Sequence, residues 1–260
     1  MSTRQSGYYT VLENKSIDDA VFRVAVAWKH ATPPKAGQFF LIKPRRSSVL
    51  LGRPISVAHY DGRSVHFLIM KLGAGTRELA ETGEGEELSM IGPLGNGWAD
   101  FLPGVPQNGK PIAFVSGGLG CAPLMYFAEE PAIRSFPSFH FYAGFPTASP
   151  QLTGMITALP MPAHKLIVTT DDGTDGEKGF ITDALNAGDY AAVFSCGTPA
   201  MLKTVAAICG KAGTACFIST ENRMACGVGA CLGCTVRTVY GNKRCCTDGP
   251  VFNAMEALFA

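Results

Sequence analysis

The chain has 260 residues, which exceeds the usual size of one domain and predicts two domains, or two domains with a small appended module. Its formal net charge of +1 leaves no basic surplus for phosphate contacts, so we expect no nucleic-acid partner. The first residues lack a secretory signal, and no apolar run reaches the length of about 18 residues that a membrane span needs. We therefore expect a cytoplasmic protein without a membrane partner.

The first hundred or so residues predict a small antiparallel β-barrel. Short segments rich in β-branched and aromatic residues alternate there with Gly, Pro or Asp turns. The expected strands are Val21–Trp28, Phe39–Ile42, Ile55–His59, Val65–Met70 and Glu87–Ile91. One short helix, Thr76–Glu81, follows Gly73 and Gly75, so its N-terminus is open to an anion.

A different pattern follows the segment Leu102–Lys110, whose two prolines and two glycines indicate a domain junction. Strand-like and helix-like segments alternate beyond it, which predicts a parallel α/β sheet. The expected strands are Ile112–Val115, Phe139–Tyr142, Leu166–Thr170 and Ala192–Cys196, and the expected helices are Ala122–Glu130, Ile181–Asn186 and Pro199–Ala207. The predicted domains are therefore a β-barrel over residues 1–103, a parallel α/β domain over 104–212 and a small cysteine-rich module over 213–260.

Five of the nine cysteines lie close together near the end of the chain, and without an export signal we expect no disulfide framework. Four of them have the spacing Cys-x4-Cys-x2-Cys-x11-Cys, which is the plant-type spacing for the ligands of a 2Fe-2S cluster. They are Cys226, Cys231, Cys234 and Cys246. The neighbouring Gly227, Gly229 and Gly233 predict a tight loop whose backbone N–H groups reach the sulfurs.

Two alternatives to this ligand set stay open on the residues alone. A structural zinc site also takes four cysteines, although zinc ribbons prefer two Cys-x2-Cys pairs and this tail has one. Cys245 lies beside Cys246 and competes with it for the fourth ligand position. Cys209 and Cys216 are expected to be small buried side chains instead.

The segment Arg53-Pro54-Ile55-Ser56 is a candidate cofactor site. A guanidinium, a rigid proline and a hydroxyl on one short stretch suit a diphosphate and a ribityl chain. Further along, Gly73-Ala74-Gly75-Thr76 places a glycine turn before a helix N-terminus that suits the same phosphates. Ile91-Gly92-Pro93-Leu94-Gly95 then ends the barrel with another tight turn.

The segment Phe114–Leu124 combines an apolar strand, a glycine turn and a helix start. Its glycines, Gly117, Gly118 and Gly120, would let a pyrophosphate approach the backbone and the helix N-terminus. Alone this pattern also fits any α/β turn. The later segment Tyr142–Thr147 has no Arg for the 2′-phosphate of NADP, which favours NAD, with Lys165 and Lys178 left as alternative cations.

The segments RPIS, GAGT and IGPLGNG, in this order, resemble the FAD-binding domain of the ferredoxin-NADP reductase superfamily. Within it, the chain closely resembles the PyrK family, the electron transfer subunits of bacterial dihydroorotate dehydrogenase B. The resemblance extends over the whole chain and is most specific in MACGVGACLGC and CTDGPVF. It implies a β plus α/β fold with an antiparallel FAD-binding barrel, a parallel-sheet nicotinamide domain and a 2Fe-2S module.

The resemblance also implies roles for individual residues. FAD would be bound by Arg53, Pro54, Ile55 and Ser56, with Ile69, Met70 and Lys71 along it and Gly75 and Thr76 at its diphosphate. Gly117, Gly118 and Gly120 with Cys196 and Gly197 would border the NAD site, and Cys246 would be the fourth cluster ligand. At Cys196 the family commonly has CGP, whereas this chain has CGTP. No role is expected for Cys121, and Thr169–Gly173 is interpreted equally well as a polar turn.

The implied function is electron transport in pyrimidine biosynthesis. An FMN-containing dihydroorotate dehydrogenase catalytic subunit would oxidise dihydroorotate, and electrons would pass through the 2Fe-2S cluster and FAD to NAD. Such a route needs no catalytic acid, base or nucleophile in this chain. The expected assembly is a heterotetramer with two copies of each subunit.

Two other functions are weighed against this one. The chain would also suit the small subunit of a sulfide dehydrogenase or of an NADH-dependent ferredoxin:NADP oxidoreductase, with a larger partner. A non-enzymatic redox sensor or zinc-stabilised adaptor is the other alternative. Three nucleotide-compatible segments in one chain argue against that last hypothesis.

Overall fold

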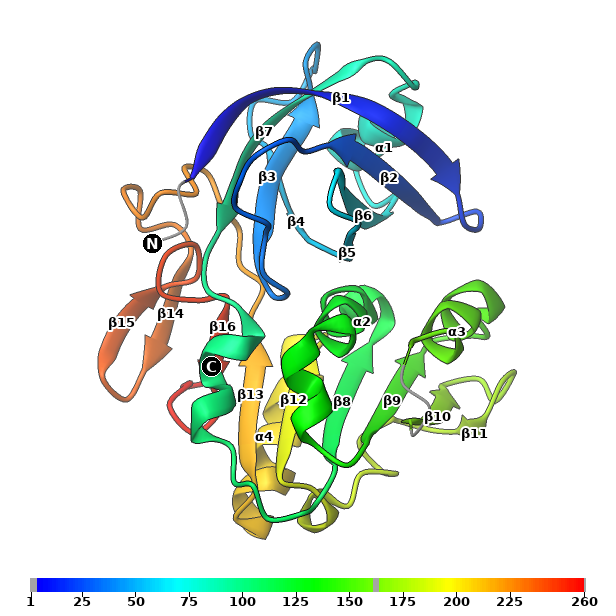
Figure 1. Cartoon of the computed structure of the whole chain (residues 1–260), viewed down its shortest axis with the longest axis vertical. Helices are drawn as coiled ribbons and strands as arrows, with labels where there is room; N and C mark the ends of the chain where they lie inside the picture. The colour runs from blue at the N-terminus through cyan, green and yellow to red at the C-terminus, as the bar shows by residue number, and fades with distance from the viewer. Residues whose placement is uncertain (1–3, 161–163, 260) are drawn as a thin grey trace.

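The computed structural model describes residues 4–160 and 164–259, which form two seven-stranded β-sheets and a two-stranded hairpin. In Figure 1 the N-terminal sheet lies above the C-terminal sheet, and the hairpin lies beside both. The predicted pair of β and α/β domains with a small C-terminal module is therefore confirmed. None of the helices within these residues is long and apolar enough to cross a membrane.

The N-terminal sheet is antiparallel throughout and has the strand order β4-β3-β7-β1-β2-β6-β5. Its strands are β1 (Gln5–Ser16), β2 (Val21–Ala27), β3 (Phe39–Pro44), β4 (Arg53–Ser56), β5 (His59–Tyr60), β6 (Ser64–Met70) and β7 (Glu87–Leu94). Large side chains such as Phe22, Phe40 and Phe67 are fully buried between its layers. Helix α1 (Ala74–Glu81) covers this core with Leu79. The predicted barrel and its one helix are confirmed.

Two parts of this sheet differ from the expectation. The long strand β1 was not predicted, because its apolar side chains do not gather on a buried face: Tyr8 and Leu12 are exposed and Val11 is buried. The strand expected over Ile55–His59 is divided into β4 and β5, and β4 already begins at Arg53, where it pairs with β3.

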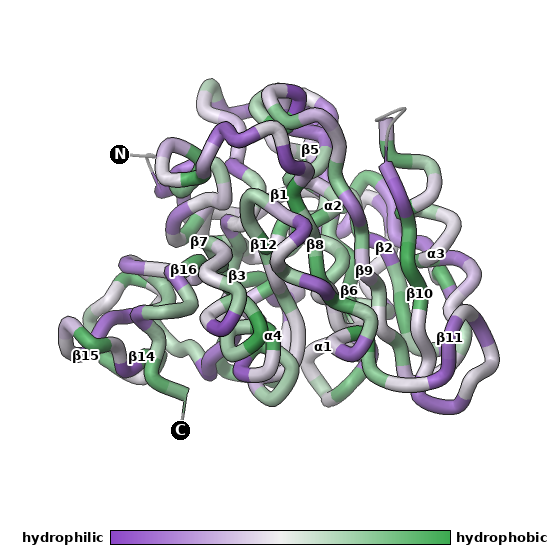
Figure 2. The backbone as a smooth tube through the Cα atoms, turned by 90° about the horizontal axis from the view of Figure 1, so that it is seen from below, coloured by the Kyte–Doolittle hydropathy of each residue, from purple (hydrophilic) through white to green (hydrophobic). Residues whose placement is uncertain are grey.

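The C-terminal sheet has the order β11-β10-β9-β8-β12-β13-β16, and all neighbours except β13 and β16 are parallel. Its strands are β8 (Ile112–Gly117), β9 (Phe139–Phe145), β10 (His164–Thr170), β11 (Glu177–Lys178), β12 (Ala192–Cys196), β13 (Ala215–Ser219) and β16 (Val251–Asn253). The α-helices are α2 (Cys121–Glu129), α3 (Pro150–Thr157) and α4 (Pro199–Ala212), and short 3-10 turns are η1 (Trp98–Gly104), η2 (Gly118–Gly120), η3 (Pro131–Ser135) and η4 (Ala187–Asp189). In Figure 2 the central strand β8 is mostly hydrophobic, whereas the edge strand β11 is hydrophilic. The predicted parallel sheet is confirmed.

The helix predicted over Ile181–Asn186 is wrong. The residues form turns in which Asp183 N–H donates to Phe180 O at 3.0 Å and Leu185 N–H donates to Thr182 O at 3.3 Å. Ile181 and Leu185 are buried, so a helix-like spacing of apolar residues arises here from two turns packed on the core. Helix α3 was not predicted, and α4 continues past the expected end to Ala212, where Gly213 has a φ of 67° and ends it.

The C-terminal segment joins both sheets. Strands β13 and β16 lie beyond residue 212, where we expected the cysteine-rich module to begin, yet both belong to the second sheet. Strands β14 (Thr235–Thr238) and β15 (Gly241–Arg244) form the hairpin. The Asn96 amide donates to the carbonyl oxygens of Asp248 and Val251, so the barrel holds this segment directly.

Candidate cofactor and cluster site

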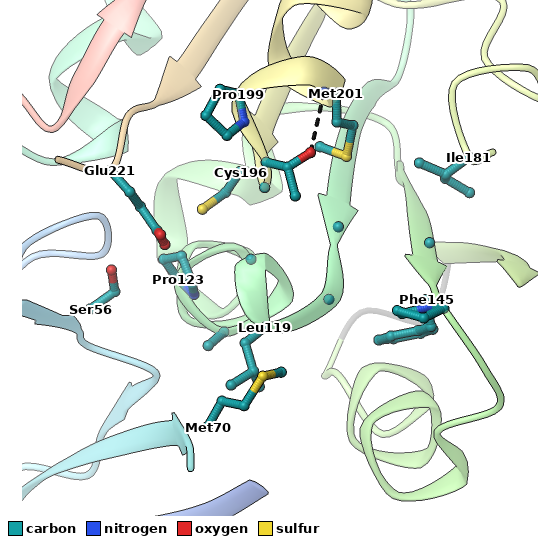
Figure 3. A pocket seen from close by; sticks show the side chains of 18 of the residues that line it. Ser56, Met70, Leu119, Pro123, Phe145, Ile181, Cys196, Pro199, Met201 and Glu221 are labelled. Carbon is teal, nitrogen blue, oxygen red and sulfur yellow. Dashed lines mark hydrogen bonds between the residues drawn. The ribbon is translucent and has the colours of Figure 1, made fainter. Parts of the chain in front are cut away.

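A cavity of about 830 Å³ lies between the barrel and the parallel sheet. Most of the predicted binding residues line it together, namely Arg53, Pro54, Ile55, Ser56, Ile69, Met70, Thr76, Gly117, Gly118, Gly120, Cys196 and Gly197. In Figure 3 Ser56 and Met70 of the barrel face Leu119 and Pro123 of the second domain. Lys71 does not line the cavity, because its Nζ donates to Asp19 O at 3.1 Å. The two domains therefore share one binding cavity.

Arg53 and helix α1 form the polar end of the cavity on the barrel side. The Arg53 guanidinium donates to Leu51 O at 2.8 Å and lies over Gly75, where a Cβ would come within 2.5 Å of Nε. Thr76 Oγ1 accepts hydrogen bonds from the N–H groups of Leu72 and Gly73 and closes the turn before the helix. A fixed cation at a helix N-terminus is a suitable place for a diphosphate.

The rest of the barrel side is mostly apolar. Ile55, Leu68, Ile69 and Met70 line the cavity next to the Ser56 hydroxyl. A flat ring system needs such an apolar slot with a few polar groups at its rim. The polar end and the apolar slot together fit FAD.

The two glycine-containing segments of the second domain meet at the ends of neighbouring strands. A Cβ at Gly120 would clash with the carbonyl oxygen of Cys196, and one at Gly117 would lie 2.9 Å from Met201 Sδ. Gly118 has a φ of 54°, which glycine adopts readily. These glycines therefore allow β8, β12 and the start of α2 to meet closely beside the cavity, at the kind of strand end and helix start that suits a pyrophosphate.

The unusual proline position in the CGTP segment has a local explanation. Thr198 is the N-cap of α4, and its Oγ1 accepts a hydrogen bond from Met201 N–H at 3.3 Å. Pro199 then stands in the first turn of the helix, where its missing N–H costs nothing.

The cysteines of this domain are packing residues by their burial. Cys121 is fully buried in the core, and Cys196 is only 2% exposed although it lines the cavity. Burial raises the pKa of Cys121 to about 12 and that of Cys196 higher still, so both thiols stay protonated. Cys209 and Cys216 are also buried, as we predicted.

Several cavity residues were missed in the sequence. Glu221 follows β13, and its carboxyl group lies on the same side of the cavity as Ser56 and Cys196 (Figure 3). Solvent reaches part of this side chain, but the surrounding protein raises the pKa of its carboxyl group by desolvation. Asp171 and Phe180 line the far end of the cavity. Glu221 lies five residues before Cys226, and this closeness to the cysteine run is the one sequence signal that could have found it.

The four predicted cluster ligands form two pairs. The Cys226 thiol interacts with Cys231, and the Cys246 thiol interacts with Cys234. Within the described part of the chain, no three Cys, His, Asp or Glu side chains converge on the position of one metal ion. A zinc site needs four ligands around one ion, whereas a 2Fe-2S cluster needs two thiolates at each iron. The pairwise arrangement therefore fits the two-iron cluster.

The loop at Cys226 has the predicted backbone geometry. The N–H groups of Val228 and Cys231 both donate to Cys226 Sγ at 3.4 Å, and these hydrogen bonds lower the pKa of the thiol to about 6. Gly227 and Gly229 have φ values of 65° and 79°, as a tight loop requires. The third residue of the loop with positive φ is Leu232 at 58°.

Cys245 and Cys246 face different surroundings. Cys245 is fully buried, and its Sγ donates to Thr220 O at 3.1 Å. Both cysteines belong to the buried cluster that includes the barrel residues Leu41 and Leu94, but the Cys246 thiol interacts with Cys234, and burial, followed by the Cys234 thiol, raises the pKa of Cys246 to about 11. This geometry favours Cys246 as the fourth ligand, because the Cys245 thiol is already hydrogen-bonded to Thr220.

The cluster loop lies close to the cavity through the barrel. Gly227 packs so closely on β3 that a Cβ there would lie 2.8 Å from Leu41 Cδ1. Leu41 is the register partner of Pro54 on β4, and Pro54 lines the cavity. Two adjacent strands, β3 and β4, therefore lie between the cysteine loop and the cavity, and neighbouring strands are only about 4.8 Å apart.

Sequence relatives identify the family. Residues 221–257 match the model of the iron-sulfur cluster binding domain of dihydroorotate dehydrogenase B. The dihydroorotate dehydrogenase B (NAD(+)) electron transfer subunit of Clostridium perfringens is 37% identical over 250 residues, which are 96% of each chain. The protein of the same name from Listeria monocytogenes serotype 4b is 32% identical over 254 residues, covering 95% of this chain and 96% of the relative.

Solved structures show the same fold. An NADH-dependent reduced ferredoxin-NADP oxidoreductase chain aligns with 100% of this chain and 92% of its own length, with a TM-score of 0.78 and 23% identity. A ferredoxin NADP+ reductase from Neisseria gonorrhoeae with bound FAD and NADP aligns with 84% of this chain and 94% of its own, with a TM-score of 0.67 and 18% identity. By its sequence relatives over nearly its whole length, the chain belongs to the family of dihydroorotate dehydrogenase B (NAD(+)) electron transfer subunits.

Proposed function

We propose that this chain carries electrons from a dihydroorotate dehydrogenase catalytic subunit to NAD+ in pyrimidine biosynthesis. The observation that carries the proposal is the close packing of the cysteine loop on β3, one strand away from the cavity-lining residue Pro54. A cluster and a flavin held at these two places would be near neighbours. The family relationship supplies the substrate and the direction of the transfer.

We assign the cofactors to the residues as follows. The cluster ligands are Cys226, Cys231, Cys234 and Cys246. The FAD residues are Arg53, Pro54, Ile55, Ser56, Ile69, Met70, Gly75 and Thr76, and the NAD residues are Gly117, Gly118, Gly120, Cys196 and Gly197. FAD, when bound, exchanges a hydride with NAD and single electrons with an iron-sulfur cluster. The chain itself positions the groups and excludes water, and it needs no acid, base or nucleophile.

The proposed partner is an FMN-containing subunit that oxidises dihydroorotate, in an assembly of two copies of each chain. On the cysteine loop, Val228 and Leu232 are 40% and 62% exposed, and they flank the more accessible pair of thiols, Cys226 and Cys231. Exposed apolar side chains at this position suit a protein partner that receives or donates electrons there. We place the assembly in the cytoplasm, where cysteine thiols stay reduced and do not form disulfides.

The test is anaerobic reduction of NAD+ by dihydroorotate. The purified chain with FAD and cluster is mixed with an FMN-containing dihydroorotate dehydrogenase subunit, and the subunit alone and a mixture with Cys226→Ser are the controls. We expect NADH only in the mixture with the unaltered chain. If no NADH forms there, although NADH still bleaches the flavin of this chain, the proposed partner is wrong and the reductase chemistry remains.

A further inference from the structure

The shared cavity extends beyond the glycine turn to the carboxyl ends of β9 and β10, and this end has no role so far. Phe145, Pro146, Asp171, Phe180 and Ile181 line it. Figure 3 places Phe145 and Ile181 on the side of the cavity opposite Ser56. In open parallel sheets, ligands bind at the carboxyl ends of strands, so this end is available to a part of the dinucleotide far from the flavin.

Asp171 is held at this end with an unengaged carboxylate. Its backbone N–H donates to Phe145 O at 3.1 Å, which ties the end of β10 to β9. Among the described residues, none donates a hydrogen bond to the Asp171 carboxylate. The neighbouring Asp172 differs, because its carboxylate accepts from Thr174 N–H at 3.0 Å and from Thr174 Oγ1 at 2.6 Å. One carboxylate thus completes a turn, and the other is free to bind a ligand.

The charges around this end disfavour a second phosphate. Of the described residues that line the cavity, only Arg53 is cationic, and it lies on the barrel side. The Lys178 stem packs against the Gly173 turn, and the lysine does not line the cavity. Lys165 stands near the start of β10, about 20 Å from Asp171 at the usual rise per strand residue. Neither of the lysines considered in the sequence therefore neutralises Asp171.

We propose that Asp171 is the residue that selects NAD over NADP, an inference that rests on the proposed NAD site. Its carboxylate accepts hydrogen bonds from the two hydroxyl groups of the adenosine ribose, as carboxylates at such strand ends do. The same carboxylate repels the 2′-phosphate of NADP, which carries a charge near −2. Phe180, which is 67% exposed and lines the cavity, covers the adenine.

The test compares Asp171→Asn with Asp172→Asn in the purified chain carrying FAD and cluster. Steady-state oxidation of NADH and of NADPH is measured with ferricyanide as acceptor, and dissociation constants come from the fluorescence of each reduced nucleotide added to the chain after its FAD and cluster have been reduced with dithionite. We expect Asp171→Asn to raise KM and Kd for NADH about tenfold, which corresponds to the loss of one good polar contact, and to leave kcat nearly unchanged. The NADH to NADPH ratio of kcat/KM should fall at least as much, whereas Asp172→Asn should change it less than twofold.

The outcomes separate this inference from the proposed function. A ratio that stays within twofold in Asp171→Asn, or that falls equally in Asp172→Asn, overturns the role of Asp171. The visible absorption of FAD and cluster in each variant shows that the fold is kept, so a change in ratio cannot come from cofactor loss. Failure of dihydroorotate to reduce NAD+, with the ratios as expected, overturns the proposed partner and supports Asp171. An unaltered chain that binds neither nucleotide overturns both.

Discussion

The imidazole Nδ1 of His59 on the barrel lies 2.6 Å from the carboxylate of Glu129 on α2, so the pair joins the two domains that enclose the cavity. The Glu129 hydrogen bond raises the pKa of His59 against the opposing effects of partial burial and of Arg23, and Asp61 adds to the increase. A raised pKa in the folded state means that the pair stabilises the fold most below the unfolded pKa of about 6.5. The stabilisation is lost as pH rises through the folded pKa.

We therefore predict that His59→Gln lowers the free energy of unfolding by an amount that depends on pH. At pH 6 the free energy of unfolding should fall by about 0.5 kcal/mol, because the pair is partly exposed and screened. Above pH 8 the cost should approach zero. Urea unfolding at both pH values measures this loss of stability. In the double variant with Glu129→Gln, the two effects on stability should be non-additive at pH 6 and additive above pH 8. An equal cost at both pH values would contradict the ion pair.

Cys245 and Cys246 should respond differently to the same substitution. Cys246→Ser should abolish the cluster absorption and lower the iron content to the background, because it removes one of two thiolates at one iron. Cys245→Ser should keep the cluster, since a serine hydroxyl can still donate to Thr220 O, and should cost about 1 kcal/mol of stability. Iron and sulfide analysis with visible spectra decides between the two, and loss of iron in Cys245→Ser alone would reverse the ligand assignment.

Gly75→Ala should release FAD without unfolding the chain. The new Cβ would meet the Arg53 guanidinium, which can move away because it ends a flexible side chain. Moving the cation off the N-terminus of α1 should weaken FAD binding about tenfold or more, which is the loss of one charge-assisted contact. The matched control is Gly154→Ala on α3, where the Cβ meets nothing within 4 Å and the helix should gain about 0.5 kcal/mol. Flavin fluorescence after dialysis measures retention, and equal retention in both variants would refute the role of Arg53.

Gly227→Ala should prevent the cysteine loop from closing. Its φ of 65° already disfavours alanine, and its Cβ would also come within 2.9 Å of Leu94 Cδ1 and nearer still to Leu41. Gly241→Ala in the hairpin separates these effects, because it has a φ of 95° and open space around the Cβ. We expect Gly241→Ala to cost about 1 kcal/mol and keep the cluster, and Gly227→Ala to lose most of its iron after reconstitution. A full iron content in Gly227→Ala would show that the loop closes without this contact.

The parts of the site that are local in sequence could be predicted. The spacing of the cysteines predicted a tight loop at Cys226, because a cluster requires its ligands to be brought together by short loops. Glycine turns at strand ends likewise indicated both nucleotide segments, and the structure brings Gly117 and Cys196 to one cavity. Strand and helix alternation was sufficient for the parallel sheet.

The parts that depend on tertiary contacts could not be predicted. Asp171 and Asp172 are adjacent carboxylates in one turn, and only the fold shows which of them faces the cavity. Glu221 reaches the cavity because β13 joins the second sheet, although it lies beyond the predicted domain boundary. The turns over Ile181–Asn186 show the reverse case, in which burial on the core produced a helix-like pattern without a helix.

Strand β16 pairs with β13 only after the chain has passed through the whole cysteine loop and the hairpin. During synthesis, the outer edge of β13 therefore stays unpaired until that loop has been made and folded back. An open strand edge invites pairing with other chains. The last strand can therefore complete the second sheet only after the cysteine loop and the hairpin have been synthesised.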